Sequence, residues 1–406
     1  MQAAMSSRRR ATTTRDHRRG PLHPRTSARV VPDPARDDGA AAGHRADHGA
    51  ERQLGVRADQ PRQLVRDHHP SLIFAVLGLT GAYVMVRMPL TTLRKLILPA
   101  LIGSVLLVAV TLIPGVGITV NGNRNWLPLF GGFRLQPSEF AKLALVLWIA
   151  DLYARRQKSL DIPRYILTPM VPVAGAVALL VVAQRDLGTA LVIFALTVGM
   201  LWVAGLPGRH MGAILAALFL GLLVAVAQSP HRVERLLNFT NPQADADSAG
   251  YQAIHGMMAF ATGGFWGVGL GGSRQKWGSL PEAHTDFILA VIGEELGLVG
   301  TFVVLALFVL LGFAGIRVAT RTREPFVRYA AAGITIWLMI QAVINIGMVL
   351  GLLPVIGVPL PLISYGGSSL LVTLVALGIL INCATTEPGA QRALAAGRAN
   401  RRRGRK

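Results

Sequence analysis

The sequence has few charged residues and almost no cysteine. Charged side chains make up only 15% of its 406 residues, whereas an average soluble domain carries about 25%. Together with the long apolar runs, this deficit excludes an ordinary soluble enzyme and predicts an all-α protein that crosses a membrane several times. The single cysteine, Cys383, excludes a fold that is held together by disulfide bonds.

Positive charge, in contrast, is abundant, and the formal net charge is +20. Much of it lies in residues 1–70, which hold fourteen Arg and no Lys. Because this stretch has no apolar periodicity, we predict a disordered, Arg-rich leader. It lacks a folded motif and interleaved aromatics, so we predict no nucleic-acid partner. It also lacks the apolar core of a signal peptide, and a misplaced or out-of-frame gene start is a further explanation.

Nine apolar segments follow the leader. Crossing the hydrocarbon core of a bilayer takes about 20 helical residues, and backbone polar groups in lipid must be satisfied within the helix. We therefore predict a transmembrane domain over residues 71–385 and a basic cytoplasmic tail over 386–406. The nine predicted helices span residues 72–86, 96–113, 139–153, 165–183, 187–205, 211–228, 287–315, 329–350 and 362–383.

Arginine and lysine are concentrated in alternate connections between these helices. The positive-inside rule makes the basic connections cytoplasmic, so the loops at 114–138, 229–286 and 351–361 face outward. The leader would then begin on the outer side, against the same rule, and we expect that a helix is missing before residue 72. The basic connections contain Arg87, Arg94, Lys95, Arg155, Arg156, Lys158, Arg164, Arg209, Arg317, Arg321, Arg323 and Arg328.

The first outward loop carries two polar motifs. NGNRNW, which contains Arg124, is followed by LQPSEFAK. In the second motif Pro137 suits the first turn of a helix, and Glu139 and Lys142 are i,i+3 neighbours that can pair. This pattern is typical of a helix start with an interfacial charge pair.

Two further motifs also precede predicted helices. In AQRDLGTA, Asp186 lies where the chain enters a helix, and the helix dipole favours a carboxylate there. LLPVIGVPLPLISYGGSSL has three prolines and two adjacent glycines, which predict a stiff loop. Its Ser364, Tyr365, Ser368 and Ser369 can donate hydrogen bonds to a sugar or a diphosphate, or equally to freed backbone carbonyls.

The longest motif runs from Tyr251 to Gly297 and contains a glycine-rich stretch at 263–272. This stretch allows tight turns or close approach of the backbone. It is not a phosphate-binding P-loop, because no GKS or GKT follows it. Arg274 and Lys276 come directly after it, and both side chains suit phosphate oxygens.

Acidic residues follow in the same motif. Glu282, His284 and Asp286 lie at the start of a predicted helix, and Glu294 and Glu295 come two turns further along. A carboxylate at membrane depth is costly and usually functional, and an ionised Asp286 can act as a general base. No metal site is predicted, because the chain has no HExxH and one histidine with two carboxylates does not define a metal.

In this order, over residues 72–385, the motifs resemble the SEDS family (shape, elongation, division and sporulation). The motifs on which this resemblance rests are NGNRNW, QPSEFAK, QRDLGTA, GVGLGGSRQKWGSLPEAHTDFILAVIGEELG and GVPLPLISYGGSSL. PEAHTDFI with GSRQKWG resembles the division member of the family more than the elongation member. The resemblance implies ten transmembrane helices with both ends cytoplasmic, and the first of these helices is absent here.

The activity that the resemblance implies is that of a peptidoglycan glycosyltransferase in the bacterial cytoplasmic membrane. Such an enzyme polymerises lipid II into glycan strands outside the membrane during septal cell-wall synthesis. Its implied partners are a class B penicillin-binding transpeptidase and the divisome. The family's essential aspartate corresponds to Asp286. The Glu, Lys and Arg that are typical of the family's first motifs correspond to Glu139, Lys142 and Arg124.

The expected mechanism is general-base catalysis with a diphosphate leaving group. We expect Asp286 to take the proton of the acceptor sugar's 4-hydroxyl as it attacks the donor's anomeric carbon, and undecaprenyl diphosphate to leave. Arg274, Lys276 and Arg124 are candidates for stabilising the diphosphate charge, and diphosphate could recruit a divalent cation. The other candidate substrate-binding residues are Glu139, Lys142, Glu282, His284 and Ser368.

Two alternatives to the polymerase remain open. A lipid II flippase would need polar residues through the full depth of the membrane, for which Gln341, Asn345, Glu294 and Glu295 are candidates. A non-catalytic scaffold for the transpeptidase would need none. The dense motifs gather in the outward loops, which favours the polymerase. The sequence also departs from the family's usual pattern at Arg185, where proline is usual, and at Ile356, where threonine or lysine is common.

Overall fold

The computed structural model describes residues 72–120, 122–129, 133–228, 249–277, 280–393 and 396. The predicted leader over 1–70, the first part of the 229–286 loop and most of the basic tail lie outside these residues. By contacts the chain divides into an N-terminal unit and a unit that begins at Val65. Everything described below belongs to the second unit.

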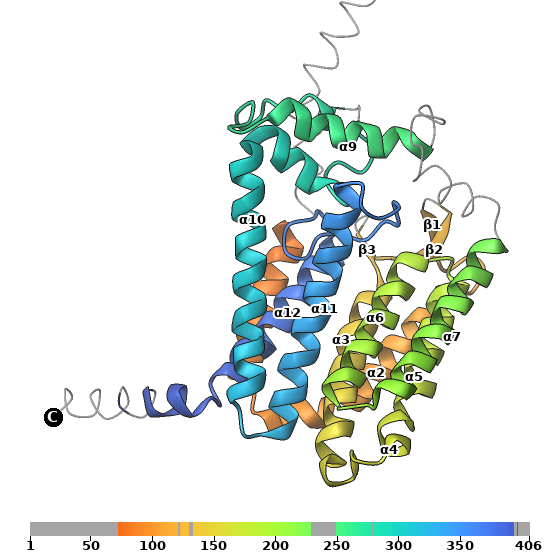
Figure 1. The fold of residues 1–406 in the computed structure, drawn as a ribbon, viewed down its shortest axis with the longest axis vertical. Coiled ribbons are helices and arrows are strands. Elements are labelled where there is room, and N and C mark those ends of the chain that lie inside the picture. The colour runs from red at the N-terminus through yellow and green to blue at the C-terminus, as the bar shows by residue number, and fades with distance from the viewer. Residues whose placement is uncertain are drawn as a thin grey trace, which may run out of the picture. The chain divides into compact units, whose positions relative to one another are not determined.

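The described residues form a bundle of helices with a small sheet at one end (Figure 1). Five helical stretches are long and apolar enough to cross a membrane, and three shorter apolar helices accompany them. The chain is therefore a multi-pass membrane protein. The main helices are Leu72–Arg87, α2 (Leu90–Val110), α3 (Pro137–Arg155), α4 (Pro163–Leu167), α5 (Met170–Ala183), α6 (Leu187–Val203), α7 (Gly208–Ala227), α9 (Ala249–Gly263), α10 (Ile288–Arg321), α11 (Pro325–Val349) and α12 (Gly367–Ala384).

Each of the nine predicted spans overlaps a helix of the structure, although the count of nine crossings stays a prediction. The span 165–183 is split into α4 and α5. The span 96–113 is wrong at its start, because α2 begins at Leu90 and includes Arg94. The reason is a partner on another helix: Arg94 Nε donates to Asp151 Oδ1 at 2.7 Å, so the charge is compatible with a packed helix.

The helices alternate in direction, so successive connections lie at opposite ends of the bundle. One end carries the sheet, α9 and residues 351–366, and we call it the loop end (Figure 1). The other end carries α4 and the ion pairs of Asp151 and Glu387 with arginines. We call it the basic end. This separation agrees with the alternation of basic connections along the sequence.

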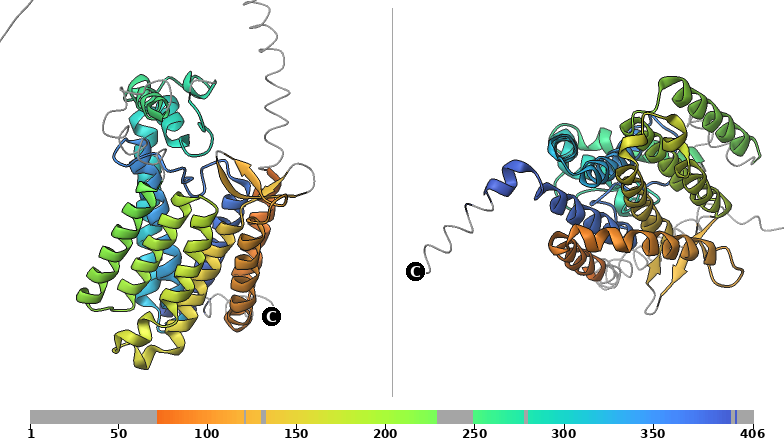
Figure 2. Two further views of the ribbon diagram at one scale, coloured as in Figure 1. Left: turned by 90° about the vertical axis from the view of Figure 1, so that its right-hand side faces the viewer. Right: turned by 90° about the horizontal axis from the view of Figure 1, so that it is seen from below.

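Most residues of α3 and α11 are buried, so these two helices form the centre of the bundle. Tyr153 of α3 packs edge-on against Tyr329 of α11 with ring centroids 5.6 Å apart. Helix α2 and the helix before it, both orange in Figure 2, lie along one side. Helix α10 instead exposes a row of large apolar residues, such as Val309 and Phe313, as expected for a surface that faces lipid.

The loop end contains two elements that the sequence does not predict. Strands β1 (Ile118–Val120), β2 (Asn123–Pro128) and β3 (Arg134–Leu135) form an antiparallel sheet in the order β1-β2-β3. Helix α9 lies within residues 229–286, for which the sequence predicts only a long loop. The strands are two to six residues long, too short for hydrophobic alternation to reveal them.

Helix α10 is broken at Gly297, which corrects the single uninterrupted helix predicted over 287–315. Gly297 has φ 68° and ψ −163°, a conformation available only to glycine. The glycine-rich stretch fills the break: Val268 N and Gly269 N donate to the carbonyls of Glu294 and Glu295. Two amides beyond the break donate in turn to carbonyls of the same stretch. The freed backbone groups of the broken helix are thereby satisfied.

Candidate active site at the loop end of the helices

Asp286 lies directly before α10 and faces the 351–366 loop. Its side chain is half-buried. A Cβ atom placed on Gly357 would be 3.3 Å from Asp286 Oδ2, so the carboxylate lies against the backbone of that loop. The main chain of Asp286 is held from below by α11, where Asn345 Nδ2 donates to the Asp286 carbonyl at 2.7 Å. The predicted base is thus fixed at the loop end.

The electrostatic surroundings of Asp286 suit a general base. Burial has the largest effect, followed by the negative charges of Glu282 and Asp186, and together they raise the pKa of Asp286 from 3.8 to about 7. A base is most effective when its pKa lies near the working pH. These surroundings are compatible with the predicted role of Asp286 as a general base.

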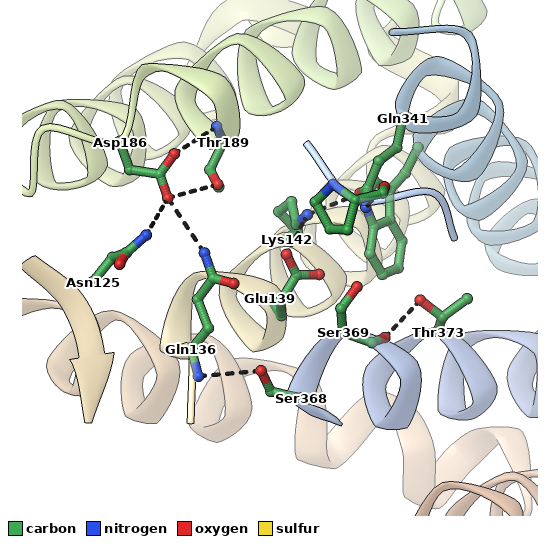
Figure 3. A network of polar contacts seen from close by, with 12 residues as sticks. Asn125, Gln136, Glu139, Lys142, Asp186, Thr189, Gln341, Ser368, Ser369 and Thr373 are labelled. Carbon is green, nitrogen blue, oxygen red and sulfur yellow. Dashed lines mark hydrogen bonds and ion pairs between the residues drawn. The ribbon is translucent and has the colours of Figure 1, made fainter. Parts of the chain in front are cut away.

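Asp186, whose charge acts on Asp286, is held in place by four hydrogen bonds. It caps α6, and its oxygens accept hydrogen bonds from Thr189 N and Thr189 Oγ1, both at 2.9 Å (Figure 3). Two amide groups complete the shell: Asn125 Nδ2 of β2 at 2.7 Å and Gln136 Nε2, directly before α3, at 3.3 Å. The predicted helix start at Asp186 is confirmed, and its carboxylate ties three elements together.

Glu139 and Lys142 form the predicted ion pair, with Lys142 Nζ 2.8 Å from Glu139 Oε1. The pair is not interfacial, as the helix-start interpretation implied, because both side chains are almost fully buried. Lys142 Nζ also donates to Gln341 Oε1 at 2.9 Å (Figure 3). The same oxygen accepts a second hydrogen bond, from Trp337 Nε1. Gln341 Nε2 donates to the carbonyl of Pro359 at 3.1 Å and so links the pair to the 351–366 loop.

The start of α3 meets the start of α12 beside this pair. Gln136 N donates to Ser368 Oγ at 3.3 Å (Figure 3). Within the described residues, Ser138 Oγ and Glu139 Oε2 are buried without a hydrogen-bond partner. Ser368 therefore makes a structural contact between the starts of two helices.

The cationic candidates lie in two places. Arg274 is exposed, whereas Lys276 Nζ forms an ion pair with Glu295 of α10. Glu294 is buried and accepts hydrogen bonds from Ser273 Oγ and from the amide of Arg274 at 3.0 Å. Glu294 and Glu295 thus anchor the loop that carries the cations.

The remaining candidates divide into those beside Asp286 and one on the sheet. Glu282 and His284 are exposed on the turn that ends at Asp286, and Glu282 Oε2 accepts from Thr285 Oγ1 at 2.6 Å. Arg124 is half-buried on β2, and its amide donates to the carbonyl of Gln184 at 3.0 Å. The described residues contain no group of three or more His, Cys, Asp or Glu that could hold a metal ion.

The two unusual positions of the sequence also lie at the loop end. Arg185 is exposed with φ 67°, a backbone conformation that proline cannot adopt, and its amide donates to the Val182 carbonyl at 2.9 Å. Arginine in place of the usual proline is therefore compatible with this turn. A Cβ atom placed on Gly188 would clash with the carbonyl oxygen of Ile356, so the loop packs directly on α6.

Three contributors to the site escaped sequence reasoning. Asn125 and Gln136 lie inside the motifs NGNRNW and LQPSEFAK, but only the fold shows that both donate to Asp186. Gly357 lies within the proline-rich motif and receives no special weight from the sequence. Its positive φ of 72° and its contact with Asp286 are visible only in three dimensions.

Replacing Gly357 by alanine is expected to lower activity at least tenfold. The added methyl group would press on Asp286 Oδ2, and a displacement of a catalytic group by about 1 Å can lower a rate about 100-fold. Gly351→Ala is the matched control, because Gly351 has a similar φ of 68° but its Cβ would meet only Met257 Sδ at 3.8 Å. Both variants should lose about 1–2 kcal/mol of stability from left-handed strain.

The measurement is the turnover rate and the thermal unfolding of both variants side by side. A selective loss of turnover in Gly357→Ala supports the close contact with Asp286. Equal turnover in the two variants at equal stability would contradict it.

Comparison with known proteins identifies relatives over most of the chain. The family of FtsW, RodA and SpoVE, described as cell cycle proteins, matches residues 60–388. A protein of Mycobacterium tuberculosis named as a probable peptidoglycan glycosyltransferase FtsW is 42% identical over 327 residues, which cover 80% of this chain. This chain spans only 62% of that relative's length. A protein of Geobacter metallireducens with the same name is 41% identical, covering 78% of this chain and 84% of its own.

A solved structure gives the same result for the fold. A chain of a peptidoglycan synthase complex, described as coordinating polymerization and crosslinking, aligns with a TM-score of 0.65 and 31% sequence identity. The alignment covers 78% of this chain and 89% of that chain.

Proposed function

This chain belongs to the FtsW, RodA and SpoVE family of cell cycle proteins, and from that premise we propose that it is a peptidoglycan glycosyltransferase of the division type. In this proposal it polymerises lipid II into glycan strands for septal cell-wall synthesis. The observation that carries the proposal is Asp286, a carboxylate at the loop end with its pKa raised to about 7. The names of the relatives support the same activity.

In the proposed reaction, Asp286 acts as the general base. The 4-hydroxyl oxygen of the acceptor sugar forms a bond to the anomeric carbon of the donor, and its proton moves to the Asp286 carboxylate. The bond between that carbon and the diphosphate oxygen breaks, and undecaprenyl diphosphate leaves with the electron pair. Asp286 then returns its proton to water.

The proposed leaving group carries negative charge, which cations must stabilise. Arg274 is the first candidate, because its side chain is exposed, whereas Lys276 is paired with Glu295. Arg124 on β2 is the second. A divalent cation would bind through the diphosphate itself, since the described residues offer no cluster of three metal-ligating side chains.

The other candidates have supporting roles in this proposal. Glu282 contributes negative charge beside Asp286, and His284 and Ser368 offer hydrogen bonds to the sugars. Glu139 and Lys142 organise the interior of the site, because they are almost fully buried and bonded to each other.

We also propose that the loop end faces outward from the bacterial cytoplasmic membrane. The arginines of the opposite end support this orientation, because basic connections stay in the cytoplasm. The proposed partners are a class B penicillin-binding transpeptidase and divisome proteins. A crosslinking partner is consistent with the peptidoglycan synthase complex to which the chain is similar.

The residues that a flippase would use are engaged at the loop end. Glu294 accepts hydrogen bonds from the loop before it, and Gln341 and Asn345 donate to carbonyls of the 351–366 loop. These contacts favour a fixed site at one face rather than a path through the membrane.

The test is a reconstitution of the full chain with its transpeptidase partner and fluorescent lipid II. If the chain is a polymerase, long glycan strands should form, and a muramidase should degrade them. Translocation of lipid II across vesicles without strands would instead identify a flippase. Neither strands nor translocation, with binding to the transpeptidase kept, would instead identify a scaffold.

A further inference from the structure

We propose that Asn345 is the positioning residue that sets where Asp286 presents its carboxylate, by holding the main chain of Asp286 and the 351–366 loop together. The inference rests on the proposed function, because it assumes that Asp286 does the chemistry. Asn345 is fully buried in α11. Its Nδ2 donates to the Asp286 carbonyl and to the Val358 carbonyl, both at 2.7 Å.

The two carbonyls belong to the two sides of the site. Val358 directly follows Gly357, whose backbone lies against the Asp286 carboxylate. One amide group therefore fixes both the residue that carries the carboxylate and the segment against which the carboxylate rests. Any shift of this amide changes the distance between them.

Asn345 is also part of a larger clamp on the same turn. Three successive carbonyls each accept a hydrogen bond: His284 from Tyr365 N at 2.8 Å, Thr285 from Ser364 Oγ at 2.6 Å, and Asp286 from Asn345. The first two donors lie in the 351–366 loop itself. Asn345 is the donor that comes from a membrane-spanning helix, so it ties the clamp to the rigid centre of the bundle.

A buried amide with two strong hydrogen bonds contributes to stability wherever it lies, so the positioning role must be separated from a structural one. The chain contains a matched control in Asn382 of α12. Its Nδ2 also donates to two backbone carbonyls, those of Met85 and Met88, both at 2.7 Å. Asn382 is buried like Asn345 but lies at the basic end.

The experiment compares Asn345→Ala with Asn382→Ala in the full chain with its transpeptidase partner, using lipid II as substrate. Each variant loses two hydrogen bonds from a side-chain amide to backbone carbonyls, so we expect similar losses of thermal stability. Asn345→Ala should lower kcat about 10- to 100-fold, because the carboxylate is displaced, while KM changes less than about twofold. Asn382→Ala should keep the wild-type kcat and KM.

A second pair of variants, Asn345→Gln and Asn382→Gln, keeps the amide and displaces it by one methylene group. This pair is used if alanine at position 345 prevents folding. As with alanine, we expect a lower kcat with little change in KM at position 345, and no change at position 382. Equal kcat losses at both positions, or an unchanged kcat at position 345, would overturn the positioning role. The proposed function fails separately, since it requires that the wild-type protein polymerise lipid II at all.

Discussion

Asp286→Asn is expected to lower kcat for lipid II polymerisation about 100- to 10,000-fold, the usual contribution of a general base. Asparagine has nearly the same shape but cannot take up the proton of the acceptor hydroxyl. The substitution also removes a negative charge that lies near those of Glu282 and Asp186. The variant should therefore fold and be at least as stable as the wild-type protein.

The measurement is strand formation from purified lipid II, with thermal unfolding recorded on the same samples. Asp161→Asn is the control, because Asp161 is exposed in the connection between α3 and α4 at the basic end. It should polymerise at the wild-type rate. Strand formation by Asp286→Asn at more than about a tenth of the wild-type rate would remove Asp286 from the role of base.

Lys142→Met is expected to destabilise the protein by about 3–5 kcal/mol, the usual effect of leaving one partner of a buried ion pair alone. Methionine approximates the length and volume of the lysine stem but removes the charge, which lies 5.4 Å from the centroid of the Trp337 ring. The carboxylate of Glu139 loses its only cationic partner in the described part of the chain, and its second oxygen is already unpartnered there.

The double variant Glu139→Gln/Lys142→Met isolates the unpaired charge as the cause. Removing the carboxylate as well should recover more than half of the lost stability, because the two substitutions are strongly coupled. Thermal unfolding of both variants in the same detergent provides the comparison. A double variant that is no more stable than Lys142→Met would contradict the buried ion pair.

Much of the fold follows from the sequence because each helix carries its own signal. Length and apolarity locate the membrane-spanning segments, and Pro137 and Asp186 mark helix starts that the structure confirms. The i,i+3 spacing of Glu139 and Lys142 predicts their contact. These are local features, and local features can be read along the chain.

The remaining features depend on segments that are far apart in the sequence. The break at Gly297 exists because a glycine-rich stretch thirty residues earlier satisfies its free backbone groups. The pKa of Asp286 is raised mainly by burial, then by the charge of Glu282, and also by that of Asp186, which lies one hundred residues away in the sequence. From the sequence, Asn345 is only a polar residue that could line a path through the membrane. Its two carbonyl partners reveal that it lies beside Asp286.

The most direct test of the central role of Asp286 is the pH dependence of kcat for lipid II polymerisation. The base must be ionised, so the rate should fall as the pH drops below the pKa of Asp286 and level off above it, with a midpoint of about 7. Glu282→Gln removes a nearby negative charge and should move the midpoint to lower pH. A rate that stays constant down to about pH 5, as an ordinary carboxylate would give, would contradict the account.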